Sequence, residues 1–76
     1  MEVVNEISRA LQLGDLNTVQ KKIKEALEEG VSAETILNEG LLDGMTIIGE
    51  KFKKNEVFVP EVLIAARAMN GGMEIL

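Results

Sequence analysis

The stretch GDLNTVQKKIKEALEEG, residues 14–30, decides the fold class because it contains a whole helix with both of its end signals. Asp15 is placed to accept hydrogen bonds from the free N–H groups of the first turn. Gly30 supplies the left-handed residue with which many helices end. The apolar residues between them recur at three- and four-residue spacing: Leu16, Val19, Ile23, Ala26 and Leu27. The stretch therefore predicts an amphipathic helix.

The residues before this stretch predict a second helix that pairs with it. Their apolar positions have the same spacing and end near Gly14: Val3, Val4, Ile7, Ala10 and Leu11. Only about two residues connect the two helices. A connection this short makes neighbouring helices antiparallel, so the first 30 residues predict a helical hairpin.

A third helix is predicted from Ser32, an N-cap residue, to Asn55. Its main apolar stripe is Leu37, Leu41, Met45, Ile48 and Phe52, widened by Ile36, Leu42 and Ile47. This width predicts the most buried helix of the domain. Gly40, Gly44 and Gly49 lie inside it, although each Gly costs up to ~1 kcal/mol relative to Ala. Two interpretations are open: close packing on a neighbouring helix, which we favour, or direct contact with a ligand.

The last helix is predicted to begin in the stretch EVFVPEVLIAARAM, residues 56–69. Pro60 suits the first turn, where its missing N–H leaves no bond unmade. The helix is expected to run to the end of the chain with an interruption near Gly71 and Gly72. Four helical segments, short connections and no strand signal predict an all-α fold, an up-down four-helix bundle, with residues 1–76 as a single domain.

Composition excludes several functions. The 76 residues include 8 Lys and Arg against 13 Asp and Glu, a net charge of -5, which argues against nucleic acid as a partner. The chain has no Cys and no His, so it lacks the commonest metal ligands and the commonest general base. We predict no metal site and no catalytic residue. No membrane-spanning run or secretion signal is present, and a cytoplasmic location is expected.

One face of the last helix is a candidate binding surface. Phe58, Val62, Ala65 and Met69 share that face, and Ala68 lies beside it. An aromatic residue followed by small side chains forms a flat surface, suited to a partner or a flat ligand. The alternative is that all of these residues belong to the core.

Two segments together resemble a known family. Residues 44–52 fit the pattern GM-x-x-(I/V)-G-E-x-F, and Phe58 to Glu61 fit F-(L/V)-P-(Q/E). The combination resembles the helical cap module of cobalamin-binding proteins, as found in cobalamin-dependent methionine synthase and in the corrinoid proteins of methanol and methylamine methyltransferase systems. The resemblance covers nearly the whole chain.

The resemblance implies a function that depends on a second domain. In that family the helical module lies over the upper, methyl-bearing face of the corrin ring and shields the methyl–cobalt bond. The cofactor, a cobalamin or other corrinoid, is mainly bound by a downstream Rossmann-like domain that residues 1–76 do not contain. Carried onto this sequence, the cofactor-binding residues are Phe58, Val62, Ala65, Ala68 and Met69.

The implied parent is a longer protein, a component of a corrinoid methyltransferase system. Its expected partners are the downstream domain and methyltransferase subunits. The apolar tail Met73, Ile75 and Leu76 also leads us to expect a domain from a longer chain. The alternative is a free-standing helical module for protein interaction or dimerisation, and under either hypothesis residues 1–76 alone are expected to form homodimers.

Overall fold

The chain is helical throughout, and a computed structural model describes all of residues 1–76. In chain order the elements are α1 (Glu2–Gln12), α2 (Leu16–Glu28), α3 (Ala33–Thr35), the π-helical η1 (Ile36–Leu41), α4 (Leu42–Lys53) and α5 (Val59–Met73). Because α3, η1 and α4 follow one another without a break, they form one long helix. The chain therefore folds into four helices and no strand, which confirms the predicted all-α bundle.

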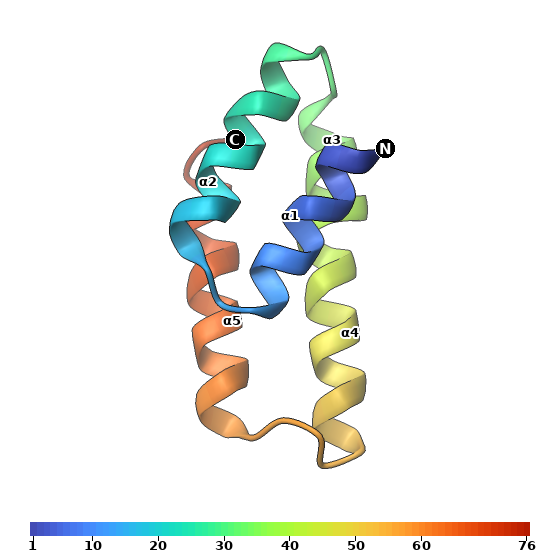
Figure 1. Cartoon of the computed structure of the whole chain (residues 1–76), viewed down its shortest axis with the longest axis vertical. Helices are drawn as coiled ribbons and strands as arrows, with labels where there is room; N and C mark the ends of the chain where they lie inside the picture. Colours follow the sequence, from blue (N-terminus) through green and yellow to red (C-terminus); the bar gives the residue numbers. More distant parts are fainter.

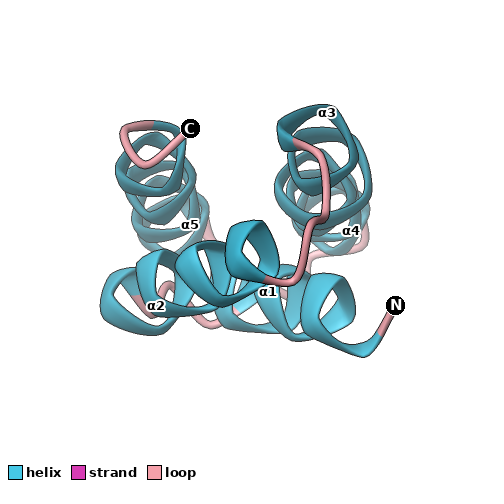
Figure 2. Ribbon diagram, turned by 90° about the horizontal axis from the view of Figure 1, so that it is seen from above, coloured by secondary structure: helices cyan, strands magenta, loops and turns pink.

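The four helices alternate in direction, but they differ in length. In Figure 1, α1 descends, α2 ascends, the long helix descends and α5 ascends. The turn between α1 and α2 lies at mid-height, whereas α4 and α5 continue past it to their own connection at the far end. Seen from above in Figure 2, α1 and α2 form one layer, and α4 and α5 form the other. One half of the bundle thus has two layers, and the other half consists of α4 and α5 alone.

Local end signals explain where the helices of the hairpin begin and end. Gly14 takes a positive φ of 71°, and the N–H of Asp15 donates to the carbonyl of Ala10 at 2.9 Å, closing α1 with a Schellman motif. Asp15 then starts α2, because its carboxylate accepts from the backbone N–H of Thr18 at 3.1 Å. Gly30, with φ 87°, ends α2 in the same way. These are the ends that the sequence predicts.

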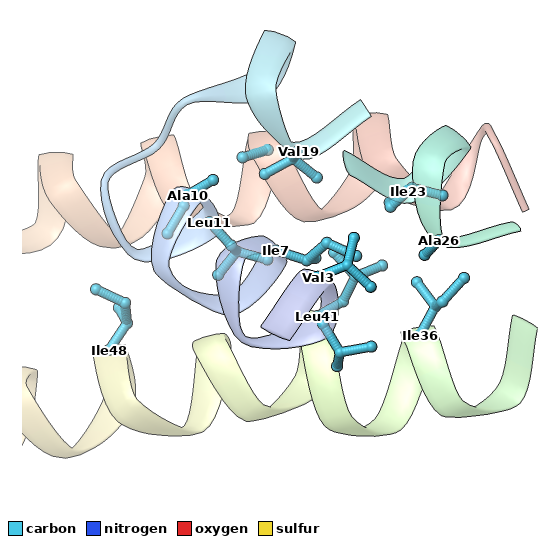
Figure 3. Close-up of a cluster of buried hydrophobic side chains, with 13 residues drawn as sticks. Val3, Ile7, Ala10, Leu11, Val19, Ile23, Ala26, Ile36, Leu41 and Ile48 are labelled. Atoms are coloured by element: carbon cyan, nitrogen blue, oxygen red, sulfur yellow. The ribbon is translucent and has the colours of Figure 1, made fainter. Parts of the chain in front are cut away.

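The hydrophobic core lies in the two-layered half. Figure 3 shows side chains of α1, α2 and the long helix pointing toward one another. Those without exposed surface include Ile7, Leu11, Val19, Ile23, Ile36 and Leu41. Burying one such side chain contributes about 1.5–3 kcal/mol, so this half accounts for most of the apolar stabilisation.

Close packing explains two of the three glycines in the long helix. A Cβ at Gly40 would lie 3.1 Å from Cγ2 of Ile7, and one at Gly44 would lie 2.9 Å from Cδ2 of Leu11. Both contacts are with α1, so these glycines let α1 approach the long helix closely. The packing interpretation is confirmed for Gly40 and Gly44.

The expected interruption of the last helix near Gly71 is wrong, because α5 runs to Met73 through both glycines. A Cβ at Gly72 would lie 2.9 Å from Cγ1 of Val19 and from Cδ1 of Ile23, and one at Gly71 would clash with Leu16. Close approach of α2, not a helix break, is the reason for the two glycines. None of the helices combines the length and the apolar composition that crossing a bilayer requires.

The long helix also contains a π turn that the sequence did not predict. Ile36 and Leu41 are both fully buried although they are five residues apart, the spacing of an i to i+5 turn. The predicted apolar stripe is not buried at its far end, where Phe52 is 45% exposed. This residue lies beyond the part of α4 that α1 covers.

Candidate functional site

We use the term distal end for residues 49–64, which comprise the last turns of α4, its connection to α5 and the first turns of α5. Large apolar side chains remain exposed there to an unusual degree for so short a segment: Phe52 (45%), Phe58 (65%), Val59 (55%), Leu63 (63%) and Ile64 (48%). Single exposed apolar residues are ordinary, but five in one short segment indicate a contact surface. The distal end is therefore the candidate functional site.

The connection at the distal end has a defined backbone shape. Asn55 adopts a left-handed φ of 61°, which Asn tolerates better than most residues. Its N–H donates to the carbonyl of Phe52 at 3.1 Å, and the N–H of Glu56 donates to the carbonyl of Lys51 at 2.8 Å. These two bonds form a Schellman motif at the end of α4. Val57, only 9% exposed, then anchors the connection against the protein.

Phe58 follows this anchor as the N-cap of α5. Its N–H donates to Oε1 of Glu61 at 3.0 Å, and its carbonyl accepts from the N–H of Glu61 at 3.0 Å. The reciprocal pair fixes the backbone of Phe58, as in one half of a capping box. Because the ring itself is 65% exposed, the fold presents an aromatic side chain to the outside on a restrained backbone.

The five residues predicted to bind a cofactor fall into three classes of exposure. Phe58 is exposed, and Val62 and Met69 are half-buried and packed against the core. Ala65 and Ala68 are fully buried, with 0% exposure each. Only Phe58, Val62 and Met69 thus have surface that a ligand could contact in this arrangement, whereas the two alanines form part of the core. Cofactor contact by any of the five stays a prediction.

Helical spacing explains this division. Ala65, Ala68 and Gly72 recur at three- and four-residue intervals and form the row of α5 that faces the core. Phe58 and Val62 lie next to that row at the start of α5, where α1 no longer covers the helix. The periodicity correctly groups these positions, but it does not specify where along the helix the cover ends.

Several exposed residues of the distal end were not among the predicted contacts. Val59 and Leu63 are four residues apart, so they lie on one side of α5, and Phe52 is on α4. The signal that could have identified them is the shortness of α1. With only 11 residues, α1 is too short to cover the whole of the long helix, which runs from Ala33 to Lys53.

A shallow pocket lies where the hairpin meets the distal end. It is lined by Gln12, Leu13, Glu61 and Ile64. Leu13, in the turn after α1, is 81% exposed, and a Cβ at the neighbouring Gly14 would clash with Ile64. The turn of the hairpin therefore packs directly on α5 and adds one more apolar side chain beside the exposed surface.

The polar side chains that form hydrogen bonds stabilise the fold and are not arranged as a metal-binding or acid–base group. Asp43 accepts from Oγ of Ser8 at 3.1 Å and so ties α4 to α1. The structure contains no group of three or more acidic, His or Cys residues that could hold a metal ion. Every buried polar side-chain atom has a hydrogen-bond partner. The distal end can cover an apolar surface, but it presents no acid–base pair.

The two groups with shifted pKa values lie on α2 and its cap. The hydroxyl and the N–H of Thr18 both donate to the carboxylate of Asp15, at 2.7 and 3.1 Å, and they lower its pKa. The carboxylates of Glu25 and Glu6, at 3.2 and 3.3 Å from the ammonium of Lys22, raise the pKa of Lys22. Both shifts reflect helix capping and surface pairing away from the distal end.

Comparison with known proteins gives the chain a family. A family model described as B12 binding domain matches residues 3–76. Among curated relatives, the chain is 39% identical over 75 residues to monomethylamine corrinoid protein 2 of Methanosarcina mazei, covering 99% of this chain and 34% of the relative. It is 33% identical over 75 residues to the trimethylamine corrinoid protein of Methanosarcina barkeri, covering 99% of this chain and 35% of the relative.

The fold agrees with a solved structure. The monomethylamine corrinoid protein of Methanosarcina barkeri superimposes with a TM-score of 0.95 at 35% identity, over 99% of this chain and 35% of that one. The chain thus spans about a third of the length of the relatives that it matches. The similarity is to a helical portion of longer proteins.

Proposed function

This chain belongs to the B12 binding domain family, as the helical cap type shared with methylamine corrinoid proteins, and we propose on that basis that it shields the upper face of a corrin during methyl transfer. The single observation that supports the shielding role most directly is that Phe58 and Phe52 stay exposed at the distal end of an otherwise well-packed bundle. A broad, flat macrocycle laid against these rings would cover that apolar surface.

The residues of this chain fit one face of a corrin, and none of them is suited to ligate its cobalt. Phe58, Phe52 and Val62 offer apolar surface, and the chain has no His or Cys to ligate cobalt from below. When bound, the corrin supplies the cobalt that carries the methyl group, and the organic chemistry belongs to the cofactor. The contribution of this chain is to exclude water and oxidants from that face.

We further propose that residues 1–76 act as one domain within a longer protein. The relatives are about three times as long as the matched portion, and the remainder is the proposed Rossmann-like corrinoid-binding domain. Methyltransferase subunits are the proposed partners of the assembled protein. For a methyl donor or acceptor to reach the corrin, the cap must move aside, so the connection between the two domains acts as a hinge.

A chimaera tests the proposal. The matching segment of the Methanosarcina barkeri monomethylamine corrinoid protein is replaced by residues 1–76, and a second version lacks the segment altogether. Both proteins are loaded with hydroxocobalamin, desalted, reduced and exposed to air, and the visible absorption spectrum follows reoxidation. We expect both to retain corrinoid and the version without the cap to reoxidise several-fold faster.

Phe58→Ala in the chimaera is expected to give an intermediate rate, since it removes the most exposed aromatic surface of the distal end. Leu27→Ala is the matched control, because Leu27 is an exposed apolar residue of α2, far from the distal end. Equal reoxidation rates with and without the cap would contradict the shielding role.

Self-association is a second candidate function, and the same exposed residues favour it. A second copy packed on Phe52, Val59 and Leu63 would cover apolar surface that otherwise faces water. Sedimentation velocity over a wide concentration range tests it with residues 1–76. A dimer that Leu63→Glu dissociates would support this function, and a monomer at the highest concentration would contradict it.

A further inference from the structure

The carbonyl oxygen of Gly71, in the last turn of α5, receives its hydrogen bond from another helix. In a regular helix this oxygen would accept from the N–H of Ile75, but that N–H donates to the carbonyl of Gly72 at 3.1 Å. The side-chain amide of Gln20 on α2 replaces it, with Nε2 donating to the Gly71 oxygen at 3.0 Å. A carbonyl that the backbone of α5 leaves free is thus satisfied by a residue 51 positions away in the sequence.

Close packing of α2 on α5 surrounds this hydrogen bond. A Cβ at Gly71 would clash with Leu16 and would lie 3.5 Å from Nε2 of Gln20. One turn further along α2, Val19 and Ile23 lie just as close to the backbone of α5. The side chain of Gln20 is itself half-buried, so water competes less for the Gly71 oxygen than at an open helix end. The end of α5 is therefore bound to α2 by packing and by one hydrogen bond.

The residues after α5 return to the core. The N–H groups of Ile75 and Leu76 donate to carbonyls three residues back, each at 3.1 Å, so the chain leaves α5 in a tighter, 3₁₀-type turn. Ile75 is half-buried and packs against the hydrophobic core. Figure 2 shows the chain turning back over the end of α5. This final turn is held at two points, the carbonyl of Gly71 and the side chain of Ile75.

The position of this turn bears on how a cap could move aside. Phe58 begins α5, and the hydrogen bond from Gln20 lies at the opposite end of the same helix. If the end of α5 were free, that helix could shift or unwind while the hairpin stayed in place. Because α2 holds it, movement of α5 carries the hairpin with it. The bending point of the proposed two-domain protein is then displaced beyond Ile75.

We propose that Gln20 fixes the last turn of α5 to α2, so that the cap opens as one rigid body and bends only after Ile75. This inference rests on the proposed cap function and on the longer protein proposed above. Gln20 is a positioning residue, because it acts through α5 from the end opposite Phe58. Without its amide, the partly buried oxygen of Gly71 would lose its donor, and the last turn would open more readily.

Proteolysis of the chimaera tests the inference without any corrin. Glu74 lies in the final turn and is exposed, so a glutamate-specific protease reports how often that turn opens. Gln20→Met keeps the length of the side chain and removes the donor. We expect cleavage after Glu74 to become about five-fold faster, the factor that corresponds to one hydrogen bond of about 1 kcal/mol. Cleavage after Glu56, in the exposed connection at the distal end, is the internal reference and should not change.

Two further variants show whether the hydrogen bond itself matters. Gln20→Lys supplies another donor that suits the carbonyl end of a helix, so it should restore slow cleavage after Glu74. Lys24→Ala, at an exposed position of the same helix, is the matched control and should leave the rate unchanged. A Gln20→Met rate equal to that of the unsubstituted chimaera would overturn the inference. An equal acceleration after Glu56 would also overturn it, because it would show a general loss of stability.

Reoxidation of the chimaera loaded with hydroxocobalamin then connects the turn to the cap. Gln20→Met should retain corrinoid and reoxidise about two- to five-fold faster, because a loosened turn lets the cap leave the corrin more often. Faster cleavage after Glu74 with unchanged reoxidation overturns the rigid-body opening and leaves the cap function standing. Equal reoxidation with and without residues 1–76 overturns the cap function, whereas cleavage after Glu74 still decides whether Gln20 holds α5.

Discussion

The two halves of this bundle contain the same residue types in different surroundings. In the half that contains the hairpin, Ile7, Leu11 and Ile23 are fully buried, and Gly40 and Gly44 lie where the long helix touches α1. At the distal end, Phe58 and Leu63 are mostly exposed, and Gly49 touches nothing. The first half is complete as a folded core. At the distal end α4 and α5 lack a second layer, and under the proposed cap function a ligand outside the chain supplies that layer.

A pair of Leu→Ala substitutions tests the contrast most strongly. Leu11→Ala should destabilise the domain by about 2–5 kcal/mol, because it leaves a cavity beside Gly44. Leu63→Ala, at a site that is 63% exposed, should change stability by no more than about 0.5 kcal/mol. Urea unfolding of residues 1–76 measures both. Comparable losses from the two variants would show that the distal end is also part of the core.

Gly44→Ala sharpens the comparison between glycines. Its Cβ would lie 2.9 Å from Cδ2 of Leu11 and 3.0 Å from the carbonyl oxygen of Ser8. Overpacking should outweigh the gain in helix propensity and leave a net loss of about 1–2 kcal/mol. Thermal unfolding of Gly44→Ala and Gly49→Ala, measured in parallel, tests whether the two substitutions change stability in opposite directions. A stabilised Gly44→Ala variant would mean that α1 can move away from α4 at little cost.

Glu61→Ala tests whether the distal end is held in shape before it binds anything. Loss of the bond to the N–H of Phe58 should cost about 0.5–1 kcal/mol and free the backbone of that residue. In the chimaera we expect faster reoxidation than in the unsubstituted protein. Glu61→Gln keeps an acceptor oxygen and should restore both properties. A Gln variant that behaves like Ala would show that charge, not the hydrogen bond, matters.

The smallest expected effect concerns the cap of α2, far from the distal end. The hydrogen bonds from Thr18 lower the pKa of Asp15, so the folded state favours its ionised form. The resulting stability is present above the ordinary carboxyl range near pH 4 and is lost as the pH falls through the lowered pKa. The stability difference between the natural chain and Asp15→Ala should therefore shrink in acid, as thermal unfolding from pH 6 to pH 2 can show. A difference that is constant over this range would contradict the assignment.

Much of the fold could be predicted from local signals. Asp15, Gly14 and Gly30 are residue types that favour helix ends, and the hairpin helices end at these residues in the structure. The continuity of α5 through Gly71 and Gly72 could not be predicted, because its cause is contact with Leu16, Val19 and Ile23, which are distant in sequence. Local rules correctly describe glycine as a helix breaker, but here a neighbouring helix decides the outcome.

The family could be predicted from the sequence, whereas the exposure of the candidate site could not. The motif residues lead to the family that the comparisons show, and the spacing of Phe58, Val62 and Ala65 selects a stretch of α5 whose contact with a cofactor stays a prediction. Which of these side chains are exposed depends on where α1 and α2 stop along α5. Ala65 and Ala68 lie within the covered part, and Phe58 lies beyond it. The spacing of apolar residues does not show how far a neighbouring helix extends.

The π turn at Ile36–Leu41 gives the long helix a tolerance to the loss of one residue that an ordinary helix lacks. It fits one additional residue into a single wider turn, so the residues after it keep their direction about the helix axis. Deletion of one residue from this turn would convert it to a regular α-helix and leave Phe52 facing as it does now, whereas a deletion at the start of α4 would rotate Phe52 by about 100° relative to α1. In evolutionary terms, a single codon can be lost at the π turn, but not a few residues later, without re-aiming the distal end.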